Sequence, residues 1–143
     1  MTAYMPQSKT DDWATPQSLF DELNAKYAFD EDVAASLHNH KCAQWFGLDH
    51  PDELRRNGLT GQWTGKSIWI NPPYGRGIAD WVAKADAYEH PVVMLLPART
   101  DTKWFHDYAL KHDVEFIKGR IKFGSSIFAA LFPSMIIKMR HAF

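Results

Sequence analysis

Four consecutive residues could carry out chemistry at the end of an apolar strand predicted over residues 67–70; they are Asn71, Pro72, Pro73 and Tyr74. The two prolines fix their own φ angles and restrict the residues before them. The side-chain oxygen of Asn71 and the backbone carbonyl of Pro72 can therefore be held facing one point. Two acceptors there can bind both N–H groups of an exocyclic amine, and Tyr74 offers a flat face on which a base can stack.

This arrangement suits methyl transfer to an aromatic amine. The adenine amino group is a poor nucleophile because its lone pair is delocalised into the ring. Acceptors that pull its hydrogens toward tetrahedral geometry localise that lone pair, and alignment with the methyl group of a sulfonium supplies much of the rate. The same acceptors would serve cytosine N4, an RNA base or a glutamine amide. A strand-ending proline turn without chemistry is the structural alternative.

The surrounding sequence predicts helices that alternate with strands. Thr15 is expected to be the N-cap of the first helix and Pro16 its first helical residue. Helical spacing of apolar residues predicts helices at 16–26, 78–85 and 102–111. Asp101 is either a general base or the N-cap of the third helix. Strands are predicted at 29–35, 67–70, 91–97, 114–117, 120–123 and 134–138, whereas 43–66 is irregular.

These elements indicate one α/β domain with a compact Rossmann-like sheet and helices on both faces. Apolar strands without polar alternation are typical of parallel sheets that are covered on both faces. Ligands bind beyond the carboxyl ends of the strands in such sheets, which places Asn71 at the expected active-site edge. The predicted division is a flexible N-terminus at 1–12 and a single catalytic domain at 13–143.

Composition excludes several other classes of protein. The chain has 143 residues, of which 45% are hydrophobic and 23% charged, so disorder, collagen and coiled coil are poor interpretations. No apolar run approaches the ~20 residues of a membrane span. The N-terminus lacks the apolar core of a signal peptide. We therefore expect a soluble cytosolic domain.

The residues with metal-binding side chains do not predict a metal site. His38, His40 and Cys42 offer three potential ligands, whereas structural zinc usually takes four from two spaced pairs. As the one cysteine of the chain, Cys42 cannot form an internal disulfide. It is interpreted as a small buried hydrophobic residue.

Charge is distributed unevenly along the chain. Residues 1–65 carry 5 basic and 10 acidic side chains, and residues 66–143 carry 11 basic and 7 acidic ones. From Lys118 onward there are five basic residues and no acidic residue. On the strand predicted at 120–123, Lys118, Arg120 and Lys122 would project to one face. A basic face suits a polyanion, and a solvated surface is the alternative.

Several stretches of the chain resemble the phage-type DNA adenine-N6 methyltransferase family, whose members use S-adenosylmethionine. The similar stretches follow one another from about residue 11 to residue 138; they are 12–20, 32–35, 39–42, 71–76, 93–105 and 117–124. The resemblance implies N6 methylation of an adenine that is flipped out of duplex DNA. It also implies a phage or prophage protein that acts in the cytoplasm of a bacterial host.

The resemblance implies a role for each matching position. The residues expected to hold the target adenine are Asn71, Pro72, Pro73 and Tyr74. Those expected at the cofactor are Thr15, Pro16, Asp32, Ala34, Asn57 and Asn71. Charge and position, and not the resemblance, place the expected DNA contacts at Lys118, Arg120 and Lys122, with Arg76, Arg99 and Lys103 at the active-site edge as the next candidates. Base readout is expected from loops within 43–66 and 118–130, because a domain of this size has little room for a separate recognition domain.

Two positions depart from the pattern of related methyltransferases. Residues 33–36 read Val-Ala-Ala-Ser where many relatives have glycines, and Asn57 stands where an aspartate is expected. Small side chains still allow the backbone to approach a cofactor. The departures favour, as an alternative, a catalytically weak relative that binds nucleic acid.

Overall fold

A computed structural model describes residues 14–124 and 128–140 of the chain. The expected flexible N-terminus at 1–12 lies outside these residues. The elements follow in the order α1 (Gln17–Tyr27), β1 (Glu31–Asp32), β2 (Gln44–Trp45), η2 (Glu53–Arg55), β3 (Ile68–Ile70), α2 (Ile78–Ala87), β4 (Val92–Pro97), α3 (Lys103–Asp107), η3 (Ala109–Lys111), β5 (Asp113–Phe116) and β6 (Ser134–Met139). None of the described helices is both long and apolar enough to cross a bilayer.

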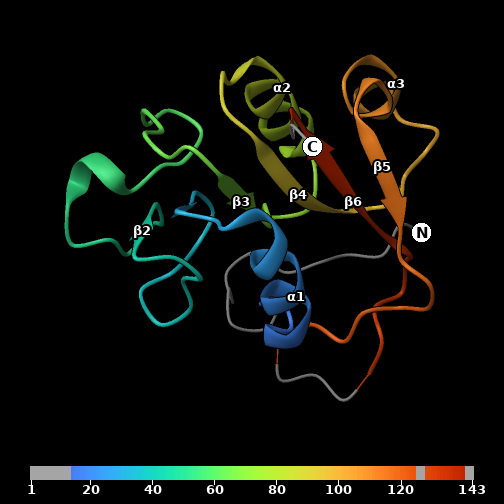
Figure 1. The fold of residues 1–143 in the computed structure, drawn as a ribbon, viewed down its shortest axis with the longest axis horizontal. Helices are drawn as coiled ribbons and strands as arrows, with labels where there is room; N and C mark the ends of the chain where they lie inside the picture. The colour runs from blue at the N-terminus through green and yellow to red at the C-terminus, as the bar shows by residue number, and fades with distance from the viewer. Residues whose placement is uncertain (1–13, 125–127, 141–143) are drawn as a thin grey trace.

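The described strands form one mixed six-stranded sheet in the order β2-β1-β3-β4-β6-β5 (Figure 1). Strands β1 to β4 are parallel to one another, and β6 is antiparallel to both β4 and β5. The α/β class is thus confirmed, and the sheet is mixed because β6 runs antiparallel to its neighbours. The described part of the connection from β5 to β6 contains no helix, and a parallel return would need a crossover.

The sheet changes direction between β1 and β3. From β1 the chain moves outward to β2 and then returns to the other side of β1 to form β3. The register pairs Asp32 at the end of β1 with Trp69, one residue before the end of β3. Ligands of open α/β sheets bind at such a switch point, beyond the carboxyl ends of the strands.

The core consists of the central strands with helices packed on them. All residues of β3 and β4 are buried, so both faces of the sheet are covered as predicted. On one face, the ring of Phe20 in α1 meets Trp69 edge-on, with centroids 5.5 Å apart. Figure 1 shows α1 apart from α2 and α3, which lie next to each other near the top of the view.

Two helix starts differ from the prediction. Helix α1 begins at Gln17 with Pro16 as its N-cap, and Thr15 makes no capping hydrogen bond because its hydroxyl is used elsewhere, as described below. Helix α3 begins after Thr102, whose hydroxyl accepts from the backbone N–H of Phe105 (3.3 Å). Asp101 is therefore not the cap. The predicted helix at 102–111 divides into α3 and the short 3₁₀ turn η3.

Two further segments differ from the expected elements. The predicted strand at 120–123 does not form, because its backbone bonds to other loops: Ile121 accepts from Ala130 (2.8 Å). The predicted alternation of buried and exposed side chains is present without a strand: Ile121 and Phe123 are buried, whereas Arg120 and Lys122 are exposed. In the segment 43–66, interpreted as irregular, Gln44–Trp45 forms β2 at the edge of the sheet.

Candidate active site

A cavity of about 520 Å³ opens at the switch point of the sheet. Its walls come from the residues before α1, the loop after β1, the segment after β2, the loop at 56–59 and the turn after β3. Eight residues expected at the target base or the cofactor line it: Thr15, Asp32, Ala34, Asn57, Asn71, Pro72, Pro73 and Tyr74. Pro16, also expected there, does not line the cavity. The structure thus brings together residues that are up to 59 positions apart in the sequence.

Asn71 is held by the segment that precedes α1. Its Nδ2 group donates to Oγ1 of Thr15 at 3.0 Å, and Thr15 is buried. This bond spans 56 residues of sequence and fixes the plane of the amide at the end of β3. It also explains why Thr15 does not cap α1.

The turn after β3 continues into the core. Pro72 is buried, Pro73 is exposed, and Tyr74 is only 5% exposed. The Tyr74 hydroxyl donates to the backbone carbonyl of Leu95 at 3.2 Å. Phe123 and Phe132 meet the Tyr74 ring edge-on.

The burial of Tyr74 limits its chemistry. Burial raises the pKa of the hydroxyl, and the charge of Arg99 opposes that rise only in part. The group is therefore a neutral donor and not a base. The stacking of a substrate base on the part of Tyr74 that lines the cavity stays a prediction.

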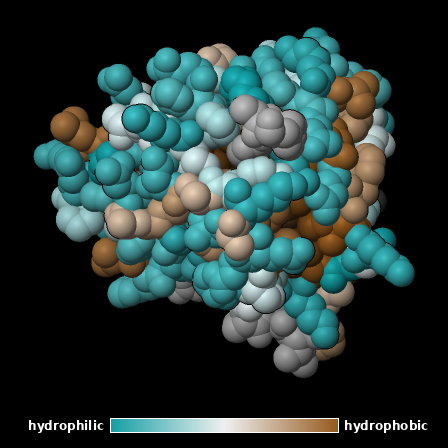
Figure 2. All heavy atoms as spheres, in the orientation of Figure 1, coloured by the Kyte–Doolittle hydropathy of each residue, from teal (hydrophilic) through white to brown (hydrophobic). Residues whose placement is uncertain are grey.

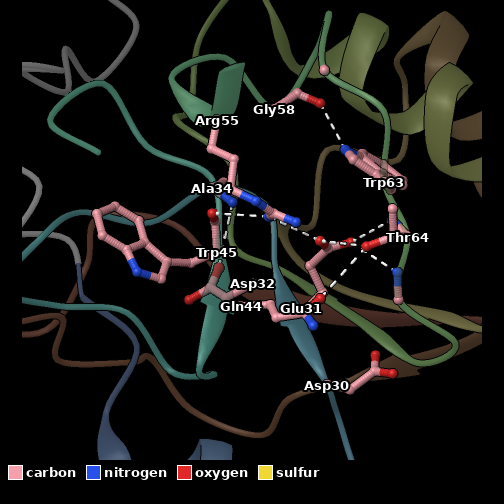
Figure 3. A network of polar contacts seen from close by, with 12 residues as sticks. Asp30, Glu31, Asp32, Ala34, Gln44, Trp45, Arg55, Gly58, Trp63 and Thr64 are labelled. Carbon is pink, nitrogen blue, oxygen red and sulfur yellow. Dashed lines mark hydrogen bonds and ion pairs between the residues drawn. The ribbon is translucent and has the colours of Figure 1, made fainter. Parts of the chain in front are cut away.

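Three consecutive acidic residues around β1 have three different environments. Asp30 accepts from the backbone N–H groups of Lys66 and Ser67. Glu31 is fully buried and bonds Arg55 (3.1 Å) and the N–H of Thr64 (3.0 Å). Figure 3 shows the Glu31 carboxylate directed away from that of Asp32. Of the three, Asp32 is the one that lines the cavity.

Asp32 is buried but retains room for a further donor. Its two carboxylate oxygens accept from the backbone N–H groups of Lys41 (2.9 Å) and Ala34 (3.3 Å). Burial raises the pKa of Asp32 to about 6, against the opposing effects of these bonds and of the Lys41 charge. An ionised carboxylate has about four acceptor positions, so a ligand can donate to it as well.

The loop at 57–61 forms a second wall and is fixed from two sides. Oδ1 of Asn57 accepts from the N–H of Leu59 (2.9 Å), which closes a local turn. From α2, the ammonium group of Lys84 donates to the carbonyls of Gly58 and Leu59 (both 2.9 Å) and Gly61 (2.5 Å). The oxygen of Asn57 therefore stabilises the loop itself.

Glycines of neighbouring loops compensate for the missing glycine-rich turn at 33–36. A Cβ on Gly58 would lie 1.9 Å from the carbonyl oxygen of Val33, and one on Gly47 would lie 2.2 Å from that of Ala35. The close backbone approach is thus provided by the segments that pack against residues 33–35. Small residues within the turn are sufficient for this packing.

Comparison with known proteins agrees with this geometry. The family model described as DNA N-6-adenine-methyltransferase (Dam) matches residues 2–133. The chain belongs to this family. Two relatives, each named DNA N-6-adenine-methyltransferase, come from Escherichia phage T1 (34% identical over 106 residues) and Haemophilus phage HP1, strain HP1c1 (32% over 116 residues).

The matched region is only part of each relative. The alignments cover 70% and 78% of this chain but 41% of the phage T1 protein and 63% of the phage HP1 protein. The chain thus spans less than two thirds of the length of either relative. The family assignment and the cavity agree with the resemblance that the sequence shows.

The cavity of this Dam-family chain also has lining residues that were not predicted from the sequence. Phe46, Leu48, Leu59 and Trp81 add apolar surface to the walls, and Lys41 adds a cation. Phe46 directly follows β2, the strand that was not predicted. Trp81 of α2 is buried and also contributes to the wall.

None of the six residues that were predicted to contact DNA lines the cavity of this Dam-family chain. Arg76, Lys103, Arg120 and Lys122 are exposed, and Arg99 is half-buried after β4. Lys103 pairs with Asp107. The exposed Lys118 lines a separate groove between α1 and β5. Figure 2 shows apolar surface on this side of the molecule, and the lining of the groove includes Leu19 and Phe116.

The potential metal ligands of this Dam-family chain serve other contacts. The His40 ring stacks on Trp45, with centroids 4.8 Å apart, and its Nδ1 bonds the carbonyl of Cys42. Cys42 is buried as predicted, and burial raises the pKa of its thiol to about 12. Within residues 14–124 and 128–140, no three His, Cys, Asp or Glu side chains form a group that could hold a metal ion.

Proposed function

We propose that the chain transfers a methyl group from S-adenosylmethionine to the N6 amine of an adenine flipped out of duplex DNA. The observation that carries this proposal is the shared cavity, in which Asn71 and Pro72 face the same space as Asp32. Membership of the Dam family and the names of the two phage relatives support the reaction and the substrate.

The residues of the cavity fit S-adenosylmethionine. Its volume of about 520 Å³ is within the range of small-molecule sites. The Asp32 carboxylate suits an ammonium or a ribose hydroxyl, and Phe46, Leu59 and Trp81 provide apolar surface for a nucleoside base. When bound, the cofactor supplies an electrophilic methyl group on a sulfonium.

The chain itself binds and orients the amine. Thr15 holds the Nδ2 edge of Asn71, which favours the Oδ1 edge as the acceptor for the substrate. The carbonyl of Pro72 is the second acceptor. Neither Tyr74 nor a metal-bound group is needed as a base. The methylated amine is acidic, so it loses its proton to water.

DNA enters this proposal through the position of the target amine. The amine is paired inside the duplex, so the base must leave the stack to reach the cavity. Exposed basic residues beside the site, Arg76, Arg120 and Lys122, are proposed to hold the phosphate backbone. Because both relatives come from phages of bacteria, we infer a phage or prophage protein that acts in the bacterial cytoplasm.

The decisive experiment incubates the purified chain with cofactor labelled in the methyl group and with duplex DNA, RNA or bulk protein. Label should enter DNA and be recovered as N6-methyladenine after digestion. Asn71→Ala should show no comparable incorporation. Label in cytosine, RNA or protein would show that the target amine belongs to that substrate and not to adenine in DNA. Cofactor binding without any transfer would favour the alternative of a catalytically weak relative.

A further inference from the structure

The lining of the cavity divides into a polar and an apolar group of residues. In the polar group, the backbone N–H of Lys41 donates to Asp32 (2.9 Å), and Asn71 donates to Thr15 (3.0 Å). The side chain of Lys41 reaches Oε1 of Gln17 at 2.8 Å, two positions after Thr15. These contacts place Thr15, Asp32, Lys41 and Asn71 in one region of the wall.

The apolar group is connected by its own contacts. The ring of Trp81 lies 2.8 Å from the position of a Cβ on Gly58, and the ring of Phe46 lies 2.4 Å from that of a Cβ on Gly61. Gly58 and Gly61 belong to the loop fixed by Lys84. Phe46, Trp81 and this loop therefore form a wall distinct from the polar one.

Lys41 is a cation in the wall that has a carboxylate beside it. Burial lowers the pKa of its ammonium, while Asp32 and Asp21 act in the opposite direction. Its Nζ donates to the neutral amide oxygen of an exposed glutamine, Gln17. An ammonium has three donors, so Lys41 can bind an anion in the cavity while keeping this bond.

We propose that Lys41 binds the carboxylate of the amino-acid portion of S-adenosylmethionine, while Asp32 binds its ammonium group. This inference rests on the proposed function. A free amino acid carries both charges on neighbouring atoms. Lys41 and Asp32 both line the cavity, and the bond from the backbone N–H of Lys41 to the Asp32 carboxylate keeps the two residues in the same part of the wall. The nucleoside then lies against Phe46, Leu59 and Trp81.

The test compares two ligands that differ only in the carboxylate: S-adenosylmethionine and its decarboxylated form. Affinities are measured by isothermal titration calorimetry on the full chain without DNA. Wild type should bind S-adenosylmethionine about tenfold to a hundredfold more tightly, as for a hydrogen bond between charged groups. Lys41→Met should remove this preference, with the affinity for the decarboxylated ligand unchanged or higher.

A matched control is Lys66→Met, because Lys66 is exposed and precedes β3 at the opposite end of the strand. It should bind both ligands like wild type. Equal affinities of wild type for the two ligands would overturn the inference without any variant, as would a Lys41→Met protein that keeps the preference. If wild type binds neither ligand, the proposed function itself is wrong and this inference falls with it.

Discussion

Asn71 belongs to the motif predicted from the sequence and also lines the cavity of the structure. Its amide is fixed by Thr15, so replacement by alanine removes a positioned acceptor and not a core side chain. By analogy with lost oxyanion donors, Asn71→Ala should lower kcat by about 10²–10³. Single-turnover methylation measures the rate, and the melting temperature is the control for folding.

A contrary result would be equally clear. Near-native turnover by a folded Asn71→Ala protein would remove the turn after β3 from the chemistry. Thr15→Val separates positioning from contact, because it keeps the shape but cannot accept from Nδ2. We expect its rate to lie between those of wild type and Asn71→Ala.

We expect Asp32 to make binding of the proposed cofactor dependent on pH. Burial raises its pKa to about 6, so between about pH 4 and pH 6 the unliganded folded chain holds a proton that the unfolded chain has lost. This group therefore contributes stability below about pH 4 that is lost as the pH rises through 6. An ammonium ligand needs the ionised form, so affinity for S-adenosylmethionine should fall as the pH drops below 6.

Calorimetric titrations from pH 5 to pH 8 measure this dependence. Each unit below pH 6 should weaken binding by up to tenfold, since one proton must be released. Asp32→Asn should bind weakly at every pH and without this slope. An affinity of wild type that is constant between pH 5 and pH 7 would argue against a ligand ammonium on Asp32.

At the scale of elements, the loop at 57–61 depends on a side chain from α2. The ammonium of Lys84 donates to three carbonyls of this loop and lies over the ring of Trp63, 4.6 Å from its centroid. Lys84→Met keeps the aliphatic stem but removes these bonds. Hydrogen–deuterium exchange of residues 57–61 should become faster, and cofactor affinity should fall.

The matched controls for this loop are Lys84→Arg and Lys66→Met. Arginine retains the charge and several donors, so its exchange rates should lie closer to wild type. The exposed Lys66 does not line the cavity, so Lys66→Met should leave the exchange rates and the cofactor affinity unchanged. Unchanged exchange at 57–61 in Lys84→Met would show that the backbone turns hold the loop unaided.

The connection between β5 and β6 carries three exposed basic residues, Lys118, Arg120 and Lys122. Phe123 and Phe132 in this connection contact Tyr74, so Lys122 is adjacent in sequence to a residue that packs on the motif. Phosphate contacts release counterions, and each contributes about −0.9 to the slope of log affinity against log salt. Alanine at Lys118, Arg120 and Lys122 together should therefore flatten the slope by roughly two to three units.

Affinity for duplex DNA over a range of salt concentrations measures these slopes. Alanine at the exposed lysines 26, 66 and 111 is the charge-matched control and should leave the slope near that of wild type. If the lines for wild type and the first triple variant are parallel, the DNA-facing surface must be sought around Arg76, Arg99 and Lys103. Lys118 contributes least if its place in the groove between α1 and β5 keeps it from DNA.

At the scale of the whole molecule, the cavity is a recess at the edge of the sheet, whereas the proposed target amine is paired inside a duplex. The proposed function therefore requires that the adenine leave the base stack. A 2-aminopurine at the target position should brighten when the chain and cofactor bind, because it leaves the base stack. A duplex that is methylated but shows no brightening would contradict extrusion.

Tyr74→Phe is informative in the same assay. It keeps the ring but removes the hydroxyl that donates to Leu95, so it should brighten 2-aminopurine as wild type does and lose about 1 kcal/mol of stability. Tyr74→Ala should weaken binding of the extruded base by ~1–3 kcal/mol if the base stacks there. The buried ring makes a stability loss unavoidable in that variant.

The sequence by itself determined the features that depend on neighbouring residues. Apolar runs predicted β3 and β4, and helical spacing predicted α1 and α2, because burial periodicity is a local signal. Two prolines after a strand identified the turn at Asn71, since they restrict the backbone wherever they occur. The position of that turn at a ligand-binding edge followed from the strand before it.

Only the tertiary structure decided which side chains share the cavity. Asp32 lines it, whereas Asp30 and Glu31 are bonded to residues 64–67 and to Arg55. The bond from Asn71 to Thr15 diverted Thr15 from the helix cap, and bonds to other loops kept 120–123 from becoming a strand. These outcomes depend on contacts between residues far apart in sequence, whose energies exceed local preference and appear only once the chain is folded.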